Sequence, residues 1–327
     1  MAYTTIDDPS AYFQCTLYVG DGQAGHAITN SGNSDLAPNW VWIKSRDDTS
    51  QHRIYDTVRG VQKPLKSDLA NAEGTDNNGV TAFGSDGFTL GNEAQSNGNN
   101  LNFVSWNWKE QAGVFDIVSY TGNGSNRTIA HNLGVVPKMM IVKRRDASAS
   151  WFVYHVANGN GNVMKLDNNE AVSAYAEYWN STTPTSSVFS LGTAATANAD
   201  GGTFIAYLFG NKQGVSKMGS YTGNGNADGA FVYLGFKPAF VMWKRTDTTN
   251  NWMMGDNKIT TFNPKDNMMR ADLANVQLST NPVDFLSNGF KIRLTGNAFN
   301  NSSGTYIYMA FAESPFVSSS GVPATAR

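Results

Sequence analysis

A glycine-rich stretch, SYTGNG, occurs twice, at residues 119–124 and 220–225, and LYVGDG at 17–22 is a related third copy. Such loops bind phosphate when a helix follows, because backbone N–H groups and the helix dipole then face the anion. Here RTIAHNLG and AFVYLGF follow, and both favour strands. We therefore interpret SYTGNG as a turn that needs a glycine with positive φ, and not as a phosphate site.

Aspartate recurs at three corresponding positions, as a catalytic acid in a triplicated enzyme would: Asp47, Asp146 and Asp247. Catalytic carboxylates work in pairs, so a second acid should stand at a fixed offset in each copy. The residues nine positions later are Asp56, His155 and Asp256. We interpret the recurring aspartates as hairpin-turn residues. Glycosidase-type pairing stays open as an alternative.

Histidine and cysteine offer no metal-binding pattern. None of the four histidines forms an i,i+4 pair or lies near Cys15, which is the only cysteine. His131, in IAHNLG, is expected to have a capping or turn role. The sequence predicts no catalytic residue, no metal ligand and no cofactor, and hence a protein that is not an enzyme.

Candidates for surface recognition are exposed aromatic side chains and the places where similar segments differ. Most of the tryptophans should fill cores. Trp179, in EYWNSTTPT beside a polar loop, is the candidate for exposure and for stacking on a sugar. Arg127 and His131 lie in SNRTIAHN, which contrasts with NADGAFVY at the same place in the next copy. We predict these three residues as candidate recognition residues.

A repeat with a period of about 100 residues must position all of these side chains. Its clearest anchor is a block that reads PNWVWIKSRD, PKMMIVKRRD and PAFVMWKRTD in turn. Each block has a proline, a lysine six positions later and an aspartate nine positions later. The repeat-defining residues are Pro38, Lys44 and Asp47, then Pro137, Lys143 and Asp146, then Pro238, Lys244 and Asp247.

The repeat predicts an all-β chain of three tandem antiparallel β-sandwich domains of the jelly-roll or lectin-like type. Their expected boundaries are 1–112, 113–213 and 214–317, followed by a polar tail at 318–327. Each domain should have six to nine short strands and its own core, because the period exceeds that of solenoid repeats.

The anchor block predicts a central strand, because four apolar residues in succession indicate burial on both faces. The proline before it suits the first position of a strand, where a missing N–H does no harm. Helical turns are expected only within residues 66–73, 169–179 and 266–275.

Composition excludes several classes of function. A formal net charge of -2 with interspersed signs gives no basic face for nucleic acid. No run of eighteen apolar residues or signal peptide is apparent. We therefore expect synthesis in a cytosol and no membrane insertion. A single cysteine leaves no internal disulfide framework.

Several long phrases resemble a family of repeat-containing virion structural proteins of marine bacteriophages, the tail-fibre-like proteins of cyanophages and pelagiphages. They include MAYTTIDDPSAYF, TIAHNLGVVPKMMIVKRRD, FVYLGFKPAFVMWKRTDTTNNWMM and LSNGFKIRLTGNAFNNSSGTYIYMAFAESPF, and the resemblance covers essentially the whole chain. The family carries no catalytic residues that could be transferred to this sequence.

The resemblance implies a non-enzymatic protein on the exterior of the virion, in a tail-fibre or host-recognition position. Its partners would be other tail or capsid proteins and, on the host, a surface glycan or receptor. Symmetric assembly favours a homotrimer. Two alternatives stay open: a capsid decoration protein, as cement or head fibre, and a carbohydrate-binding or depolymerising protein.

Overall fold

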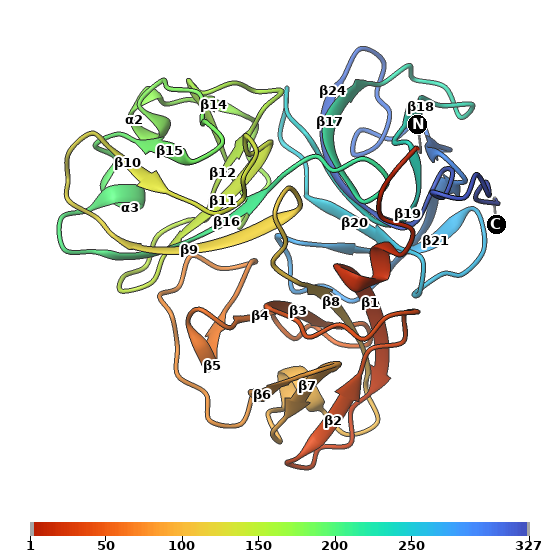
Figure 1. Cartoon of the computed structure of the whole chain (residues 1–327), viewed down its shortest axis with the longest axis horizontal. Helices are drawn as coiled ribbons and strands as arrows, with labels where there is room; N and C mark the ends of the chain where they lie inside the picture. The colour runs from red at the N-terminus through yellow and green to blue at the C-terminus, as the bar shows by residue number, and fades with distance from the viewer. Residues whose placement is uncertain (1–2, 326–327) are drawn as a thin grey trace.

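The protein is built from antiparallel β-sheets that form three lobes around a common centre (Figure 1). The structure is a computed structural model and describes residues 3–325. We call residues 13–108 lobe 1, residues 115–209 lobe 2 and residues 216–315 lobe 3. Each lobe contains eight strands, and the first and last described residues lie beside lobe 3. The all-β prediction is confirmed.

The elements follow one another in the same general order in each lobe. Lobe 1, preceded by η1 (Pro9–Ala11), comprises β1 (Phe13–Val19), β2 (His26–Thr29), β3 (Trp40–Ser45), β4 (Arg53–Asp56), β5 (Gly60–Leu65), β6 (Val80–Gly84), β7 (Gly87–Leu90), α1 (Ala94–Asn97) and β8 (Asn102–Trp108). Lobe 2 comprises β9 (Phe115–Thr121), β10 (Arg127–Ala130), β11 (Met139–Arg144), β12 (Phe152–His155), β13 (Asn162–Lys165), β14 (Ser173–Ala174), α2 (Ala176–Trp179), β15 (Val188–Leu191), α3 (Ala195–Asn198) and β16 (Thr203–Phe209). Lobe 3 comprises β17 (Ser216–Thr222), β18 (Phe231–Tyr233), β19 (Phe236–Arg245), β20 (Met253–Asp256), β21 (Lys265–Arg270), β22 (Leu278–Leu286), β23 (Gly289–Ile292) and β24 (Thr305–Pro315).

A large sheet with the same strand order forms the inner layer of every lobe. The order is β1-β8-β3-β4-β5 in lobe 1, and β9-β16-β11-β12-β13 and β17-β24-β19-β20-β21 in the other two. In lobe 2, β14 extends the large sheet beyond β13. The remaining strands form an outer layer: β2-β7-β6 in lobe 1, β10-β15 in lobe 2, and β22-β23-β18 in lobe 3, where β22 joins the two layers. Neighbouring strands pair antiparallel throughout.

The anchor blocks form central strands, as predicted. β3, β11 and β19 each lie between two partners, and nearly all of their side chains are buried. Pro38 and Pro137 precede their strands, whereas Pro238 lies inside β19. There the register shifts on both sides of Pro238, so a bulge accommodates the missing N–H.

The largest hydrophobic core is shared by all three lobes, which the expectation of a separate core in each copy did not include. Trp40 of lobe 1 stacks on Tyr207 of lobe 2, with ring centroids 4.7 Å apart. Phe13 of lobe 1 stacks on Phe311 of lobe 3 at 5.0 Å. The inner faces of the large sheets are aromatic and meet at the centre. One lobe alone would expose this face to water.

Each lobe also has a smaller outer core between its two layers. In lobe 2 this cluster includes Ile129, Trp179 and Phe189, and lobes 1 and 3 have corresponding clusters. The large sheets are therefore covered on both faces, inside by the other lobes and outside by the small sheet. Double coverage explains why the central strands read as continuous apolar runs.

Equivalent hydrogen bonds across the seams close the lobes into a ring. In each seam the ring N–H of a tryptophan or histidine donates to a backbone carbonyl of the neighbouring lobe. This residue directly precedes β4, β12 or β20. The pairs are Trp151 with Lys66 (2.8 Å), Trp252 with Lys165 (2.8 Å) and His52 with Arg270 (2.8 Å). Because the last pair joins lobe 1 to lobe 3, the first and the last lobe are tied together.

Helices are limited to single turns. α2 falls within one of the predicted segments, 169–179, whereas residues 66–73 contain no helix and residues 266–270 belong to β21. α1 and α3 lie outside the predicted segments, so the expectation of helical turns only there is wrong. Among residues 3–325, no helix is long and apolar enough to cross a membrane.

Candidate functional site

The glycine-rich stretches are turns, as predicted. Gly22, Gly124 and Gly225 have φ values of 67°, 66° and 68°, a region that glycine enters without steric cost. A strand follows each turn, β2, β10 or β18, so the arrangement of a phosphate-binding loop is not present at these turns.

A buried asparagine holds each glycine-rich turn in place. Asn198 accepts the N–H of Asn123 at 3.1 Å through its Oδ1. Its Nδ2 donates to the carbonyls of Ser125 at 2.7 Å and Gly192 at 2.8 Å. Asn97 and Asn300 bind the other two turns in the same way. The side chain thus supplies the backbone partners that the irregular loop lacks.

Sequence reasoning missed these asparagines, although a signal was available. Asn97, Asn198 and Asn300 each stand five residues before the closing strand of their lobe, which starts at 102, 203 or 305. Asparagine is common throughout the sequence and mostly indicates exposed loops, so the three buried asparagines do not stand out.

The tyrosine of each turn anchors it to the same place. The hydroxyl of Tyr120 donates to the carbonyl of Ala197 at 2.7 Å, and its ring stacks on Phe204 with an interplanar angle of 9°. Tyr18 and Tyr221 make corresponding contacts. The whole SYTGNG motif is therefore explained by structure within the lobe.

The recurring aspartates are hairpin residues, as predicted. Asp146 accepts the N–H of Thr203 at 3.0 Å and pairs with Arg144. The hydrogen bond from Arg144 lowers the pKa of Asp146 to about 2. Asp247 and Asp47 likewise accept the N–H that starts the closing strand. A carboxyl with a lowered pKa is a poor general acid at neutral pH.

The recurring lysines are completely buried, which the sequence did not predict. Lys143 Nζ donates to the carbonyls of Arg144 at 2.8 Å and Ala149 at 2.9 Å, and to that of Ala70 in lobe 1 at 3.3 Å. Lys44 and Lys244 also donate to backbone carbonyls. Burial lowers the pKa of each of the three lysines to about 8. Lys143 and Lys244 thereby tie their hairpins to the neighbouring lobe, whereas Lys44 bonds within lobe 1.

The structure contradicts a surface role for Trp179. Its indole is fully buried, lies 5.9 Å from the ring of Tyr154 and donates to the carbonyl of Asn162 at 3.0 Å. The side chain turns inward because the outer core of lobe 2 needs a large apolar group, and the polar loop beside it covers that core.

The other two predicted recognition residues lie near each other in sequence but differ in exposure. His131 is buried, and its Nδ1 accepts the N–H of Leu133 at 3.3 Å, so its turn role is confirmed. That burial contradicts a surface recognition role. Arg127 is half-buried and donates to the carbonyl of Thr121 at 2.7 Å. Of the three, only Arg127 remains a candidate for surface contact.

A further set of equivalent residues lies where each lobe meets the next. Asp56 accepts the hydroxyl of Tyr207 at 2.6 Å, and Asp256 accepts the indole N–H of Trp106 at 3.1 Å. At the seam between lobes 2 and 3, His155 stands at the place of the aspartate and Met309 at the place of the aromatic donor. Met309 has no donor, and His155 Nε2 donates instead to a backbone carbonyl at 3.2 Å. The three residues that stand nine positions after the recurring aspartates therefore have a common role, because each bonds to the closing strand of another lobe.

His155 makes the protein sensitive to acid. Burial lowers the pKa of His155 from 6.5 to about 4. Between pH 6.5 and pH 4 the imidazole is therefore protonated in the unfolded chain but neutral in the native state. Stability therefore falls as the pH drops below 6.5, and this residue contributes a loss of about 2 kcal/mol at pH 5. Urea unfolding at pH 7 and pH 5 measures the loss.

The control for this prediction is His155→Asn, which keeps an acceptor near the N–H of Ala157 but cannot titrate. The difference in unfolding free energy between pH 7 and pH 5 should shrink by about 2 kcal/mol in the variant. An unchanged difference would show that His155 is already protonated in the native state.

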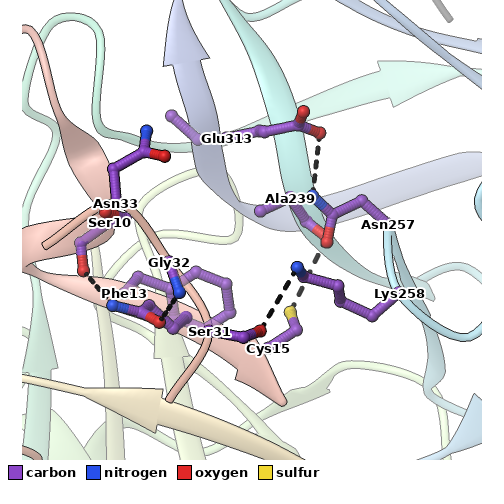
Figure 2. Close-up of a pocket in the computed structure, with 12 residues that line it drawn as sticks. Ser10, Phe13, Cys15, Ser31, Gly32, Asn33, Ala239, Asn257, Lys258 and Glu313 are labelled. Carbon is purple, nitrogen blue, oxygen red and sulfur yellow. Dashed lines mark hydrogen bonds between the residues drawn. The ribbon is translucent and has the colours of Figure 1, made fainter. Parts of the chain in front are cut away.

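A cavity of about 220 Å³ opens at the seam between lobes 3 and 1, and Figure 2 shows the side chains that line it. Lobe 1 contributes Phe13 and Cys15 from β1, together with the loop 31–33. Lobe 3 contributes Asn257 and Lys258, which follow β20, and Glu313 of β24. The polar groups of the two lobes thus face one another across the opening.

Lobe 1 departs from the other two lobes at this cavity. Cys15 stands where the larger Ile117 and Met218 occupy the other first strands. The loop before the anchor block is also longest in lobe 1, with residues 30–37 against 131–136 in lobe 2 and 234–235 in lobe 3. Gly32 of this loop donates its N–H to Gln14 Oε1 at 2.6 Å, which holds the loop over the seam. A smaller side chain and a longer loop together create the space.

Few other groups in residues 3–325 suggest chemistry. No three histidine, cysteine, aspartate or glutamate side chains in that range lie close enough to share a metal ion. The thiol of Cys15 is buried, which raises its pKa well above the ordinary value.

Fold and site together define an all-β protein of stacked antiparallel sheets whose repeated residues serve structure within and between lobes. The chain belongs to the family described as a domain of unknown function (DUF7483), whose model matches residues 8–315. The match spans all three lobes, in agreement with a core that no lobe completes alone. No curated protein matches the sequence.

Proposed function

We propose that the three lobes are tandem copies of one β-sandwich of the jelly-roll or lectin-like type, at residues 1–112, 113–213 and 214–317. The support is the common strand order of the large sheets and the equivalent bonds made by the lysines, aspartates and buried asparagines. Independent folding is not part of this proposal, because the copies share a core.

We infer that the protein is a non-enzymatic structural component of the exterior of a bacteriophage particle, in a tail-fibre or host-recognition position. The observation that carries this proposal is the closed ring: equivalent hydrogen bonds join each lobe to the next, and the other recurring residues hold turns and hairpins within each lobe. Such a body presents variable loops on a rigid scaffold. The resemblance of the long sequence phrases to virion proteins supplies the setting.

Labelling of intact particles with a gold-conjugated antibody tests the position directly. We expect label at the tail, and a reconstruction of the particle should place the three-lobed ring there. The absence of the chain from purified, infectious particles would overturn the proposal.

Capsid decoration is the second candidate, because a ring of three similar lobes matches the shape of a threefold position on a shell. Copy number separates the two positions. About six to eighteen copies per particle indicate the tail, whereas hundreds of copies indicate the head.

The homotrimer stays part of the proposal, with one restriction from the fold. The seams are satisfied within a single chain, so a trimer would have to use the outer faces of the lobes. Light scattering of the purified protein measures the mass of the assembly and hence the number of chains.

A further inference from the structure

We propose that the cavity at the seam between lobes 3 and 1 binds one ring of a neutral, hydroxyl-rich ligand, that is, a single hexose unit of a glycan. As a site of host recognition this inference rests on the exterior position proposed above. The binding itself is a property of the isolated protein and is tested without a particle.

An unpaired acceptor lies in the wall of the cavity. Asn257 is 4% exposed, and its Nδ2 donates to Glu313 Oε2 at 2.8 Å. Its Oδ1 is buried and has no hydrogen-bond partner among the described residues. An unpaired buried acceptor is costly, and Oδ1 lies just beneath the cavity surface. A small rotation of the Asn257 side chain that turns Oδ1 toward the cavity would let a ligand hydroxyl donate to it and restore the missing bond.

Charge at the cavity favours a neutral ligand over an ionic one. Lys258 is held at the opening by a weak bond to Ser31 Oγ at 3.4 Å, and Glu313 pairs with Lys237 at 3.3 Å. An anion would approach the carboxylate of Glu313, and a cation would approach the ammonium of Lys258. A hydroxyl group suits both neighbours, because it can accept a hydrogen bond from the ammonium of Lys258 and donate one to the carboxylate of Glu313.

Size and lining restrict the ligand further. A volume of about 220 Å³ is below the range of about 300–1,000 Å³ typical of sites for drug-sized molecules, so one ring is the fitting unit. Phe13, Cys15 and Ala239 supply an apolar wall opposite the polar groups. A hexose has the same division, with C–H groups on its ring faces and hydroxyls at its edge.

Saturation-transfer NMR on the whole protein tests the inference with D-glucose, D-galactose and D-mannose as probes. D-glucuronate and D-glucosamine serve as charged comparators. We expect at least one neutral sugar to bind, and to bind more tightly than either charged sugar. The inference is overturned if no neutral sugar binds at about 50 mM, or if a charged sugar binds best.

Two variants locate the binding. Cys15→Ile gives lobe 1 the residue that lobe 2 has at the same place, which fills the cavity, so binding should be lost. Asn257→Ala removes the unpaired acceptor and should weaken binding about tenfold. Ile117→Val, at the corresponding position of another seam, is the matched control and should bind as the parent does.

Thermal unfolding verifies that each variant is folded, and Asn257→Ala decides the matter if Cys15→Ile is not. Sugar binding with the affinity of the parent protein in either folded variant places the site elsewhere and overturns the inference. A protein that binds sugar but is absent from particles would contradict only the proposed function. A particle protein that binds no sugar would contradict only this inference.

Discussion

Trp40→Ala is expected to lower the free energy of unfolding by about 4 kcal/mol, because it empties the centre of the shared core. The indole is fully buried and lies 4.4 Å from the ring of Trp108 and 4.7 Å from that of Tyr207 in lobe 2. Its Nε1 has no hydrogen-bond partner among the described residues, so the loss is one of packing alone. Urea unfolding followed by circular dichroism measures it.

The consequence that distinguishes a shared core is cooperativity. Amide hydrogen exchange in Trp40→Ala should accelerate together in β3, β11 and β19, one central strand from each lobe. The matched control is Trp179→Ala, which removes a buried indole from the outer core of lobe 2. In that variant exchange should accelerate first in β10 and β15. Acceleration in lobe 1 alone after Trp40→Ala would show that the lobes are independently stable.

Asn198→Ala is expected to cost about 3 kcal/mol, because it leaves several groups of the SYTGNG turn without partners. The side chain accepts a hydrogen bond from the N–H of Asn123 and donates to the backbone carbonyls of Ser125 and Gly192. Burial of Asn198 is complete, so water cannot replace the lost bonds without a rearrangement. Chemical unfolding and hydrogen exchange at residues 122–126 measure the effect.

Two further variants separate the donor role from the acceptor role. Asn198→Asp keeps an acceptor for Asn123 but faces two carbonyls with a carboxylate, so at pH 7 it should destabilise at least as much as alanine. Asn126→Ala, exposed in the same turn, should change stability by less than about 0.5 kcal/mol. A mild effect of Asn198→Asp would mean that the donor bonds contribute little.

Much of the fold could be predicted because local rules and the repeat point the same way. Glycine at the positive-φ position of each turn and four apolar residues after each anchor proline are consequences of backbone sterics and of burial on two faces. Pro238 shows the limit of such rules, since β19 extends past it through a bulge that only pairing with β24 produces. Trp179 shows a second limit, because a polar sequence context does not reveal which way a side chain points.

The candidate site was less predictable than the fold. Asn257 and Cys15 are about 240 residues apart in the sequence and belong to different lobes, and neither stands in a motif. They come close because lobe 3 meets lobe 1, a contact in which His52 binds Arg270. No feature of the sequence indicates that contact.

The sequence by itself determined that this chain is all-β, that its segments recur with a period of about 100 residues, and that SYTGNG is a turn. These features depend on contacts within a short stretch, where composition and spacing are sufficient. Only the tertiary structure decided that the lobes share one core, that the recurring lysines are buried, two of them with a bond across a seam, and that a cavity lies beside Cys15. Those features depend on which distant surfaces meet, and the chain does not encode such contacts in any local pattern.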